Sequence, residues 1–554
     1  MSKLEQYIRF LYPEQHERVF KGVMDLIEKW KQKPFPSYPW VDNGDVLLIT
    51  YGDGIKKEGE APLKTLRRFM DSELKGYLNL IHLLPMFPYT SDDGFSVVDF
   101  RKINPDLGDW GDIEALGESY ELMFDAVLNH ASKSSGYFQE YLKCNPKYRD
   151  FFITCDPKAD YSMVTRPRTS PLLTAFDTKE GEKYVWTTFS DDQIDLNYKN
   201  PDVLLEMLDV LLLYAQKGAR FVRFDAIGFA WKEDGTTCMH LPQVHTLVKC
   251  MREVLQACAP GCTIITETNV PHKQNISYFG DGHDEAGLVY QFPLPPLTLY
   301  SFLSGRADKL SQWAASLEPT TGDTTFFNFL ASHDGIGMRP VEDILDDAQK
   351  QMMADEALRR GGQIGYRTTP EGKEVPYELN INYLDAVAGD ETDRDKMVQK
   401  FMASQCILLS FMGLPAIYYH SLLGSRNCYE EVEKSGIKRR INREKLDFDK
   451  LLSALYDEGS LRHQVLSRYK ALIEKRKEQR AFAPNSPQQV LTLDGRVLSL
   501  LRGEGEGRVL ALINVSGETV RLNTPYSGTD LLTGKEYHKD IKMSPYEYLW
   551  LKLK

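Results

Sequence analysis

Three carboxylates lie at the ends of hydrophobic segments that are predicted to be strands. Asp225 closes the segment RFVRFD, Glu267 follows TIIT, and Asp334 closes TTFFNFLASHD. Two carboxylates can transfer a glycosyl group with retention, because one attacks the anomeric carbon and the other protonates the leaving oxygen. They must then lie about 5–5.5 Å apart, and neighbouring strands spaced about 4.8 Å apart can supply that separation. The spacing is therefore compatible with retaining glycoside chemistry.

Histidine and arginine side chains accompany these carboxylates. His130 ends the segment ELMFDAVLNH, His333 precedes Asp334, and Arg223 lies two residues before Asp225, on the same side of a strand. Taken singly, an aspartate at a strand end is more often a helix cap, and Arg223 could be a buried ion-pair partner. Together, converging polar groups are costly to bury, which favours an active site.

Eight short β-type segments alternate with helical segments along the chain. This alternation is typical of βα units around a parallel sheet, and eight strands are the number that a closed (β/α)8 barrel needs. The segments are apolar on both faces, as strands covered by helices are. The carboxyl ends of barrel strands form the active-site face, which is where the polar residues stand. The predicted strands span residues 45–51, 78–85, 121–130, 220–228, 263–268, 287–294, 324–334 and 414–420.

The segments outside these strands predict the domain organisation of an α/β protein. Residues 1–44 form an N-terminal helical extension, and residues 45–483 form the barrel. An inserted subdomain follows the third strand at about 131–205, and a long loop region follows the seventh strand at about 335–390. From residue 484 to 554 the pattern changes to period-2 runs with turn signals, which indicates a C-terminal antiparallel β domain.

Composition limits the partners. The formal net charge of −12 argues against nucleic acid or an anionic membrane, because both require a basic surface. A few local arginines can still dominate one pocket, so an anionic substrate stays open. No apolar run approaches the roughly 18 residues of a membrane span, and the first residues lack a secretory core. The eight cysteines are scattered without a zinc or disulfide framework, which predicts a cytoplasmic protein with reduced thiols.

The segments DAVLNH, VRFDAIG, ITET and ASHD resemble the four motifs of the α-amylase superfamily, glycoside hydrolase family 13. The resemblance spans the barrel, the insertion and the C-terminal β domain. It implies that Asp225 is the nucleophile, Glu267 the general acid/base and Asp334 the third carboxylate that stabilises the transition state. Many members bind calcium near the first motif, where Asn129 stands, but no surplus of oxygen ligands surrounds it here, so no metal is expected.

The same resemblance assigns the flanking residues. His130 and His333 would hold hydroxyls of one glucosyl unit. Arg223 would keep Asp225 ionised and lower its pKa, whereas Glu267 must keep its proton near neutral pH.

Finer motifs resemble the sucrose phosphorylase branch of that family. In SDDGFS, Asp92 would contact the glucosyl unit and Phe95 would stack on its face, and RRINRE supplies Arg443 as a glucosyl-binding arginine. Related enzymes place a phosphate-binding arginine in the insertion, where RPR supplies Arg166 and Arg168; a solvated loop with incidental arginines is the alternative. PYELN resembles a mobile loop that alternates acceptor and phosphate sites, with Tyr377 and Glu378 at its tip.

Phosphorolysis requires phosphate to react with the glucosyl group in preference to water. Water at about 55 M exceeds millimolar phosphate by roughly 10⁴, which corresponds to about 5–6 kcal/mol of selectivity. Arginines that bind phosphate bidentately can supply this selectivity.

Within the branch, the N-terminal extension and the segments TTFSDDQIDLNY, ITETNVPHKQN and HSLLGSRN are most similar to glucosylglycerate phosphorylases. Asn269 stands where sucrose phosphorylases carry a histidine, which disfavours a fructose site. The resemblance implies double displacement on 2-O-α-D-glucosyl-D-glycerate and inorganic phosphate, without a cofactor. Sucrose or sucrose 6′-phosphate phosphorolysis, and hydrolysis or transglucosylation by the same fold, stay open. The branch contains monomers and dimers, so a homodimer is one expected state.

Overall fold

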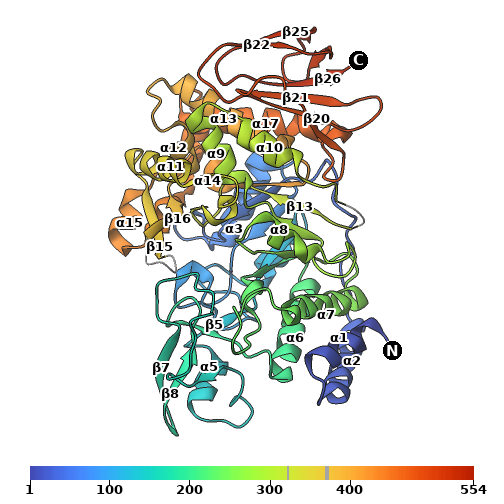
Figure 1. The fold of residues 1–554 in the computed structure, drawn as a ribbon, viewed down its shortest axis with the longest axis vertical. Helices are drawn as coiled ribbons and strands as arrows, with labels where there is room; N and C mark the ends of the chain where they lie inside the picture. Colours follow the sequence, from blue (N-terminus) through green and yellow to red (C-terminus); the bar gives the residue numbers. More distant parts are fainter. Residues whose placement is uncertain (321–322, 369–373) are drawn as a thin grey trace.

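The computed structural model describes residues 1–554 except 321–322 and 369–373. Eight parallel strands close into a barrel in the order β1-β17-β13-β12-β11-β10-β4-β3 (Figure 1), which confirms the predicted fold class. Each predicted strand is present but shorter than predicted, because residues predicted at one or both of its ends lie in the adjoining turns, loops or helices. The barrel strands are β1 (Leu47–Thr50), β3 (Leu80–Leu83), β4 (Glu121–Val127), β10 (Ala219–Asp225), β11 (Thr263–Thr266), β12 (Leu288–Tyr290), β13 (Thr325–Asn328) and β17 (Leu414–Tyr418).

Helices cover the outside of the barrel, as its two-sided apolar strands require. The principal ones are α3 (Pro62–Phe69), α4 (Trp110–Gly117), α6 (Pro201–Gln216), α7 (Pro242–Cys258), α9 (Leu294–Ser304), α10 (Asp308–Ala315), α13 (Arg394–Ser410), α16 (Phe448–Tyr456) and α17 (Leu461–Lys477). Shorter helices are α8 (His272–Asn275), α12 (Tyr383–Ala388), α14 (Tyr419–Leu422) and α15 (Tyr429–Ser435), and a small parallel pair joins β2 (Ile55–Lys56) to β18 (Leu446–Asp447). Over the described residues, no helix is both long enough and apolar enough to cross a membrane.

The insertion after β4 contains two small antiparallel sheets and projects from one end of the molecule (Figure 1). One sheet pairs the first motif with the end of the insertion, because His130 lies opposite Asp195. This pairing returns the insertion to the barrel mouth. The elements are β5 (His130–Ser132), α5 (Gly136–Leu142), β6 (Thr154–Cys155), β7 (Leu173–Thr178), β8 (Gly181–Trp186) and β9 (Gln193–Asp195).

The predicted loop region after β13 contains regular structure. A capping box in which Asp346 and Gln349 satisfy each other's backbone N–H groups starts α11 (Asp347–Arg359). A three-stranded sheet has the order β14-β16-β15, from β14 (Ile336–Gly337), β16 (Glu374–Asn380) and β15 (Gln363–Thr368). Residues 369–373 of this region lie outside the described residues. The sheet carries Glu378 to the barrel mouth.

The N-terminal helices α1 (Lys3–Leu11) and α2 (His16–Lys31) pack against α6 and α7 (Figure 1). Trp30 is buried and donates its indole N–H to Asp209 of α6 at 2.7 Å.

At the other end, Trp550 of the C-terminal β domain is buried and donates to Ser410 of α13 at 2.8 Å. The β domain contains β19 (Gln488–Val490), β20 (Val497–Arg502), β21 (Val509–Asn514), β22 (Val520–Asn523), β23 (Gly528–Asp530), β24 (Glu536–Tyr537), β25 (Asp540–Met543) and β26 (Tyr548–Leu553).

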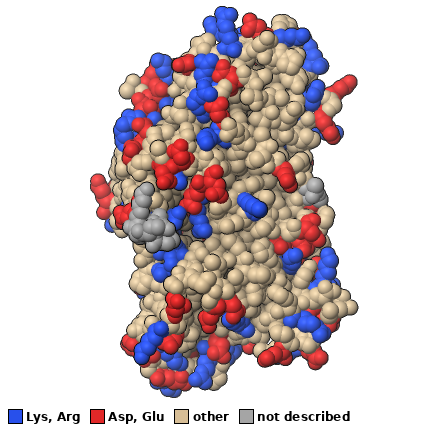
Figure 2. Space-filling view, in the orientation of Figure 1, with Lys and Arg blue, Asp and Glu red and all other residues tan. Residues whose placement is uncertain are grey.

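Charged residues of both signs are intermingled on the face drawn in Figure 2. No broad area of that face is occupied by lysine and arginine alone. The charges that bear on chemistry lie in a pocket at the barrel mouth.

Candidate active site

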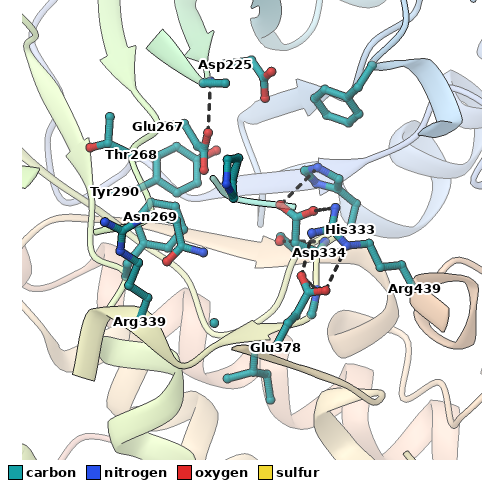
Figure 3. Close-up of a pocket in the computed structure, with 18 of the residues that line it drawn as sticks. Asp225, Glu267, Thr268, Asn269, Tyr290, His333, Asp334, Arg339, Glu378 and Arg439 are labelled. Atoms are coloured by element: carbon teal, nitrogen blue, oxygen red, sulfur yellow. Dashed lines mark hydrogen bonds and ion pairs between the residues drawn. The ribbon is translucent and has the colours of Figure 1, made fainter. Parts of the chain in front are cut away.

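One pocket at the carboxyl ends of the strands collects most of the predicted site residues (Figure 3). Arg166 and Arg443 are not among its lining residues. The predicted residues that line it are Asp92, Phe95, His130, Arg168, Arg223, Asp225, Glu267, His333, Asp334, Tyr377 and Glu378. They come from the ends of several strands, the segment after β3, the insertion after β4 and the region after β13, so the barrel brings together residues far apart in the sequence.

A buried chain of charges holds Asp225. Arg223 donates from Nη1 to Asp225 Oδ1 at 2.8 Å and to Asp125, which lies opposite it on β4. The ring of His82 donates to the other oxygen of Asp125 at 2.8 Å. Asp125 begins the DAVLNH segment and was not singled out from the sequence; the strand register explains why it contacts Arg223. Asp125 fixes the guanidinium that in turn orients Asp225.

Glu267 lies beside the same arginine. Its Oε2 accepts a hydrogen bond from the backbone N–H of Ala226 at 3.2 Å and lies 3.7 Å from Arg223 Nη2. Ala226 has a φ of 49°, which is uncommon for a residue with a side chain and turns its N–H toward Glu267. Burial raises the pKa of Glu267 to about 7, with further contributions from Asp225 and Asp334 and an opposing one from Arg223. Glu267 can therefore hold a proton near neutral pH.

Arg223 lowers the pKa of Asp225, as expected, but this effect does not set the net direction. Burial raises the pKa of Asp225, and Arg223 and His130 offset this only in part. The two carboxyls share Arg223, and the pKa of Glu267 is the one raised to about 7. Arg223 favours the ionised form of Asp225, which a nucleophile requires, while the raised pKa of Glu267 favours the proton that an acid requires.

Asp334 is surrounded by cations. Burial alone would raise its pKa, but Arg439, His333 and Arg443 hold that pKa well below its usual range. Arg439 Nη1 lies 2.6 Å from Asp334 Oδ1, while its Nη2 donates to Glu378 Oε1 at 2.7 Å. Figure 3 shows Arg439 reaching both carboxylates. Arg439 was missed from the sequence, although it begins the RRINRE run from which Arg443 was chosen.

His333 and Phe95 form the opposite wall. Their rings stack with centroids 4.8 Å apart and planes 10° apart. Burial lowers the pKa of His333 to about 3, so the imidazole is neutral at physiological pH. His130 donates from Nε2 to the Phe95 carbonyl oxygen at 2.8 Å. Gln193, which sequence reasoning also missed, donates to the same oxygen at 3.2 Å.

Asp92 and Asp93 carry positive φ angles of 51° and 47°, which a strained turn requires. Ion pairs hold this turn: Asp93 lies 2.6 Å from Arg440 and 2.7 Å from Arg443. Arg443 also donates to the His333 carbonyl oxygen at 2.7 Å and lies 4.0 Å from Asp92. The structure therefore places Arg443 behind the pocket wall, where it braces Asp92 and His333.

A buried lysine fills the region near Asn129 where related proteins bind calcium. Lys232 Nζ lies 2.5 Å from Asp195 Oδ2, 2.8 Å from Asn129 Oδ1 and 2.6 Å from the Phe229 carbonyl oxygen. Within the described part of the chain, no group of three or more His, Cys, Asp or Glu residues is arranged to hold a metal ion. The ammonium group satisfies these oxygens itself.

The outer part of the pocket is lined by Arg168, Tyr377, Glu378, Asn269 and an arginine that sequence reasoning missed, Arg339. Glu378 is held in place by Arg439 and by the backbone N–H of Gly335, which donates at 3.1 Å. Arg166 is exposed and donates to the Ser170 carbonyl oxygen within its own loop. Of the two predicted phosphate arginines, only Arg168 lines the pocket.

Residues 77–350 match the model of the α-amylase catalytic domain, and residues 498–553 match that of a β-galactosidase C-terminal domain. A glucosylglycerate phosphorylase of Spirochaeta thermophila is 45% identical over 100% of this chain and 98% of its own length. The Allomeiothermus silvanus glucosylglycerate phosphorylase is 48% identical over 99% and 97%. A sucrose phosphorylase of Streptococcus mutans is 30% identical over 72% and 81%.

Among solved structures, the sucrose 6F-phosphate phosphorylase of Thermoanaerobacter thermosaccharolyticum superposes with a TM-score of 0.76 at 25% identity, covering 90% of this chain and 98% of that one. The full-length likeness to phosphorylases and the catalytic-domain match agree with the carboxylate arrangement of the barrel mouth. The chain thus belongs to glycoside hydrolase family 13, the α-amylase family, in the branch of the sucrose and glucosylglycerate phosphorylases.

Proposed function

We propose that this chain is a retaining glucosylglycerate phosphorylase. The reaction is 2-O-α-D-glucosyl-D-glycerate plus phosphate to α-D-glucose 1-phosphate plus D-glycerate. The observation that carries the proposal is a pocket in which burial raises the pKa of Glu267 to about 7 beside Asp225, and in which Arg168 has no hydrogen bond or ion pair to another described residue. The 45% and 48% identical relatives support the choice of glucoside.

In the first step, Asp225 attacks the anomeric carbon while Glu267 donates its proton to the glycosidic oxygen. The bond between that carbon and oxygen breaks, D-glycerate leaves, and a glucosyl ester forms on Asp225. Asp334 is ionised and faces the same space, so it can accept hydrogen bonds from sugar hydroxyls as positive charge develops on the ring. Phe95 offers an apolar face to the sugar, and the neutral His333 offers a ring nitrogen to a hydroxyl.

In the second step, a phosphate oxygen attacks the anomeric carbon from the side that glycerate left. The ester bond to Asp225 breaks, and the carboxylate of Glu267 accepts the phosphate proton. Two inversions give net retention and an α-configured product. Arg168 lies beside Tyr377 on the outer wall, where its free guanidinium can pair bidentately with phosphate. This charge is a means by which phosphate can compete with water.

The test is a substrate panel with and without phosphate. The enzyme is incubated with glucosylglycerate, sucrose, sucrose 6′-phosphate and glucosylglycerol, and α-D-glucose 1-phosphate and free glucose are measured separately. We expect phosphate-dependent glucose 1-phosphate chiefly from glucosylglycerate. Free glucose at a rate independent of phosphate would refute phosphorolysis. Glucose 1-phosphate from sucrose but not from glucosylglycerate would refute the choice of acceptor.

The site of action is proposed to be the cytoplasm. All eight cysteines are free, including Cys258 and Cys262, which are close in sequence. A homodimer stays a prediction, and light scattering of the purified protein tests it.

A further inference from the structure

We infer that Arg339 binds the carboxylate of the glycerate unit and sets the preference for an acidic acceptor. The inference rests on the proposed function and extends it to a residue of the acceptor site. Arg339 lies five residues after Asp334, at the start of a 3-10 turn (Arg339–Val341) that follows β14. Figure 3 shows its side chain reaching toward Asn269, with Arg439 on the other side of the pocket.

Among the described residues, four arginines line the pocket, and two of them are already neutralised by carboxylates. Arg223 pairs with Asp125 and Asp225, and Arg439 pairs with Asp334 and Glu378. Arg168 and Arg339 are half-buried, and their guanidinium groups make no hydrogen bond or ion pair with any residue that the structure describes. A guanidinium held at a pocket wall without a protein partner is suited to pair with an anionic ligand.

The reaction offers two anions to these two arginines. Phosphate is one, and the glycerate carboxylate is the other. The carboxylate is bonded directly to the carbon that carries the glycosidic oxygen, so it must lie close to the acid that protonates this oxygen, Glu267. The cation that binds the glycerate carboxylate must therefore lie on the Glu267 side of the pocket.

The contact of its segment with Asn269 places Arg339 on the Glu267 side of the pocket. Asn269 is two residues beyond Glu267, and its amide packs so closely on Gly337 that a Cβ there would lie 2.9 Å from Asn269 Nδ2. The glycine therefore lets the segment that carries Arg339 approach the end of β11. Arg168 enters instead from the insertion. Burial raises the pKa of Tyr377, whereas Arg168 and Arg339 both lower it, so both charges act on the outer wall.

The test uses the reverse reaction, with α-D-glucose 1-phosphate as donor and two acceptors of the same carbon skeleton, D-glycerate and glycerol. D-Glycerate carries a carboxylate where glycerol carries a hydroxymethyl group. The variants are Arg339→Gln, which removes the charge, and Arg339→Lys, which keeps the charge without the planar fork. Arg359→Gln, an exposed arginine on α11, is the matched control. The readout is the ratio of kcat/KM for glycerate to that for glycerol.

For Arg339→Gln we expect the ratio to fall about 30- to 100-fold, chiefly through the KM for glycerate, as loss of a charge-assisted bidentate pair predicts. Arg339→Lys should fall less, and Arg359→Gln should match the wild type. An unchanged ratio, or equal losses with both acceptors, would overturn the assignment while glucosylglycerate phosphorolysis by the wild type stands. A wild type that does not use glycerate would instead overturn the proposed function and this assignment together. Thermal melting of each variant shows that it is folded.

Discussion

Replacing Glu267 by glutamine should stabilise the folded protein, and the gain should grow with pH. Glutamine has the shape of the protonated acid but cannot ionise. In the wild type, burial raises the pKa of Glu267 from 4.5 to about 7. Because each pH unit between these values corresponds to about 1.4 kcal/mol, ionising this carboxyl in the folded state costs about 3 kcal/mol more than in the unfolded chain.

The sign of the pH dependence follows from the raised pKa. Below pH 4.5 the carboxyl is protonated in both states, so it contributes no difference. Between pH 4.5 and about 7 the unfolded chain ionises first, and the wild type loses stability relative to Glu267→Gln. Above pH 7 the difference reaches its full value. Asp225 shares Arg223 with this carboxyl, so the measured gain includes any change in the ionisation of Asp225.

The assay is differential scanning calorimetry of the wild type and Glu267→Gln at intervals from pH 4.5 to 8.5. The melting temperature of the variant should exceed that of the wild type by an amount that increases up to about pH 7 and then levels off. Glu118→Gln, a surface carboxylate paired with Arg67, is the control and should show a small difference at every pH. A difference between Glu267→Gln and wild type that does not grow with pH would refute the argument that burial of this carboxyl is costly.

Two further predictions concern the same site, and a third concerns the buried Lys232. Because Glu267 must be protonated to assist glycerate departure, kcat/KM for phosphorolysis should fall above about pH 7, and a flat profile to pH 9 would contradict its role as the acid. Asp225→Asn should lower kcat by at least about 10³-fold while the circular dichroism spectrum is retained; turnover near the wild-type level would refute the nucleophile assignment. Lys232→Ala leaves the buried Asp195 carboxylate without its cation, so the protein should lose about 3–5 kcal/mol of stability, and an unchanged melting temperature would show that the pair is dispensable.

The barrel was predictable because its strands are apolar on both faces and end in polar residues. The register then explains a contact that spacing alone could not: Asp125 and Arg223 are 98 residues apart but lie opposite each other on β4 and β10. Sequence reasoning identified Arg223 as a partner that lowers the pKa of Asp225, but spacing alone could not weigh this effect against burial, which raises the net pKa.

The outer pocket was less predictable because its residues are placed by contacts between loops. Arg439 reaches Asp334 and Glu378 from a 3-10 turn near residue 440, and Arg339 depends on the packing of Gly337 on Asn269. Neither position follows from strand periodicity. Arg166 and Arg168 are two residues apart, and their loop conformation alone decides that Arg168 lines the pocket while Arg166 bonds to Ser170.

The distribution of charge in the pocket bears on why phosphate, rather than water, would accept the glucosyl group from Asp225. At the base, Arg223 and Arg439 are neutralised by four carboxylates, so they offer little attraction to a free anion. At the outer wall, Arg168 and Arg339 have no such partners within the described chain. A neutral water molecule gains little from these charges, whereas phosphate gains a charge-assisted pair. On this proposal the carboxylates form the glucosyl ester, Arg168 favours phosphate over water as the molecule that receives the glucosyl group, and Arg339 favours glycerate in the reverse reaction.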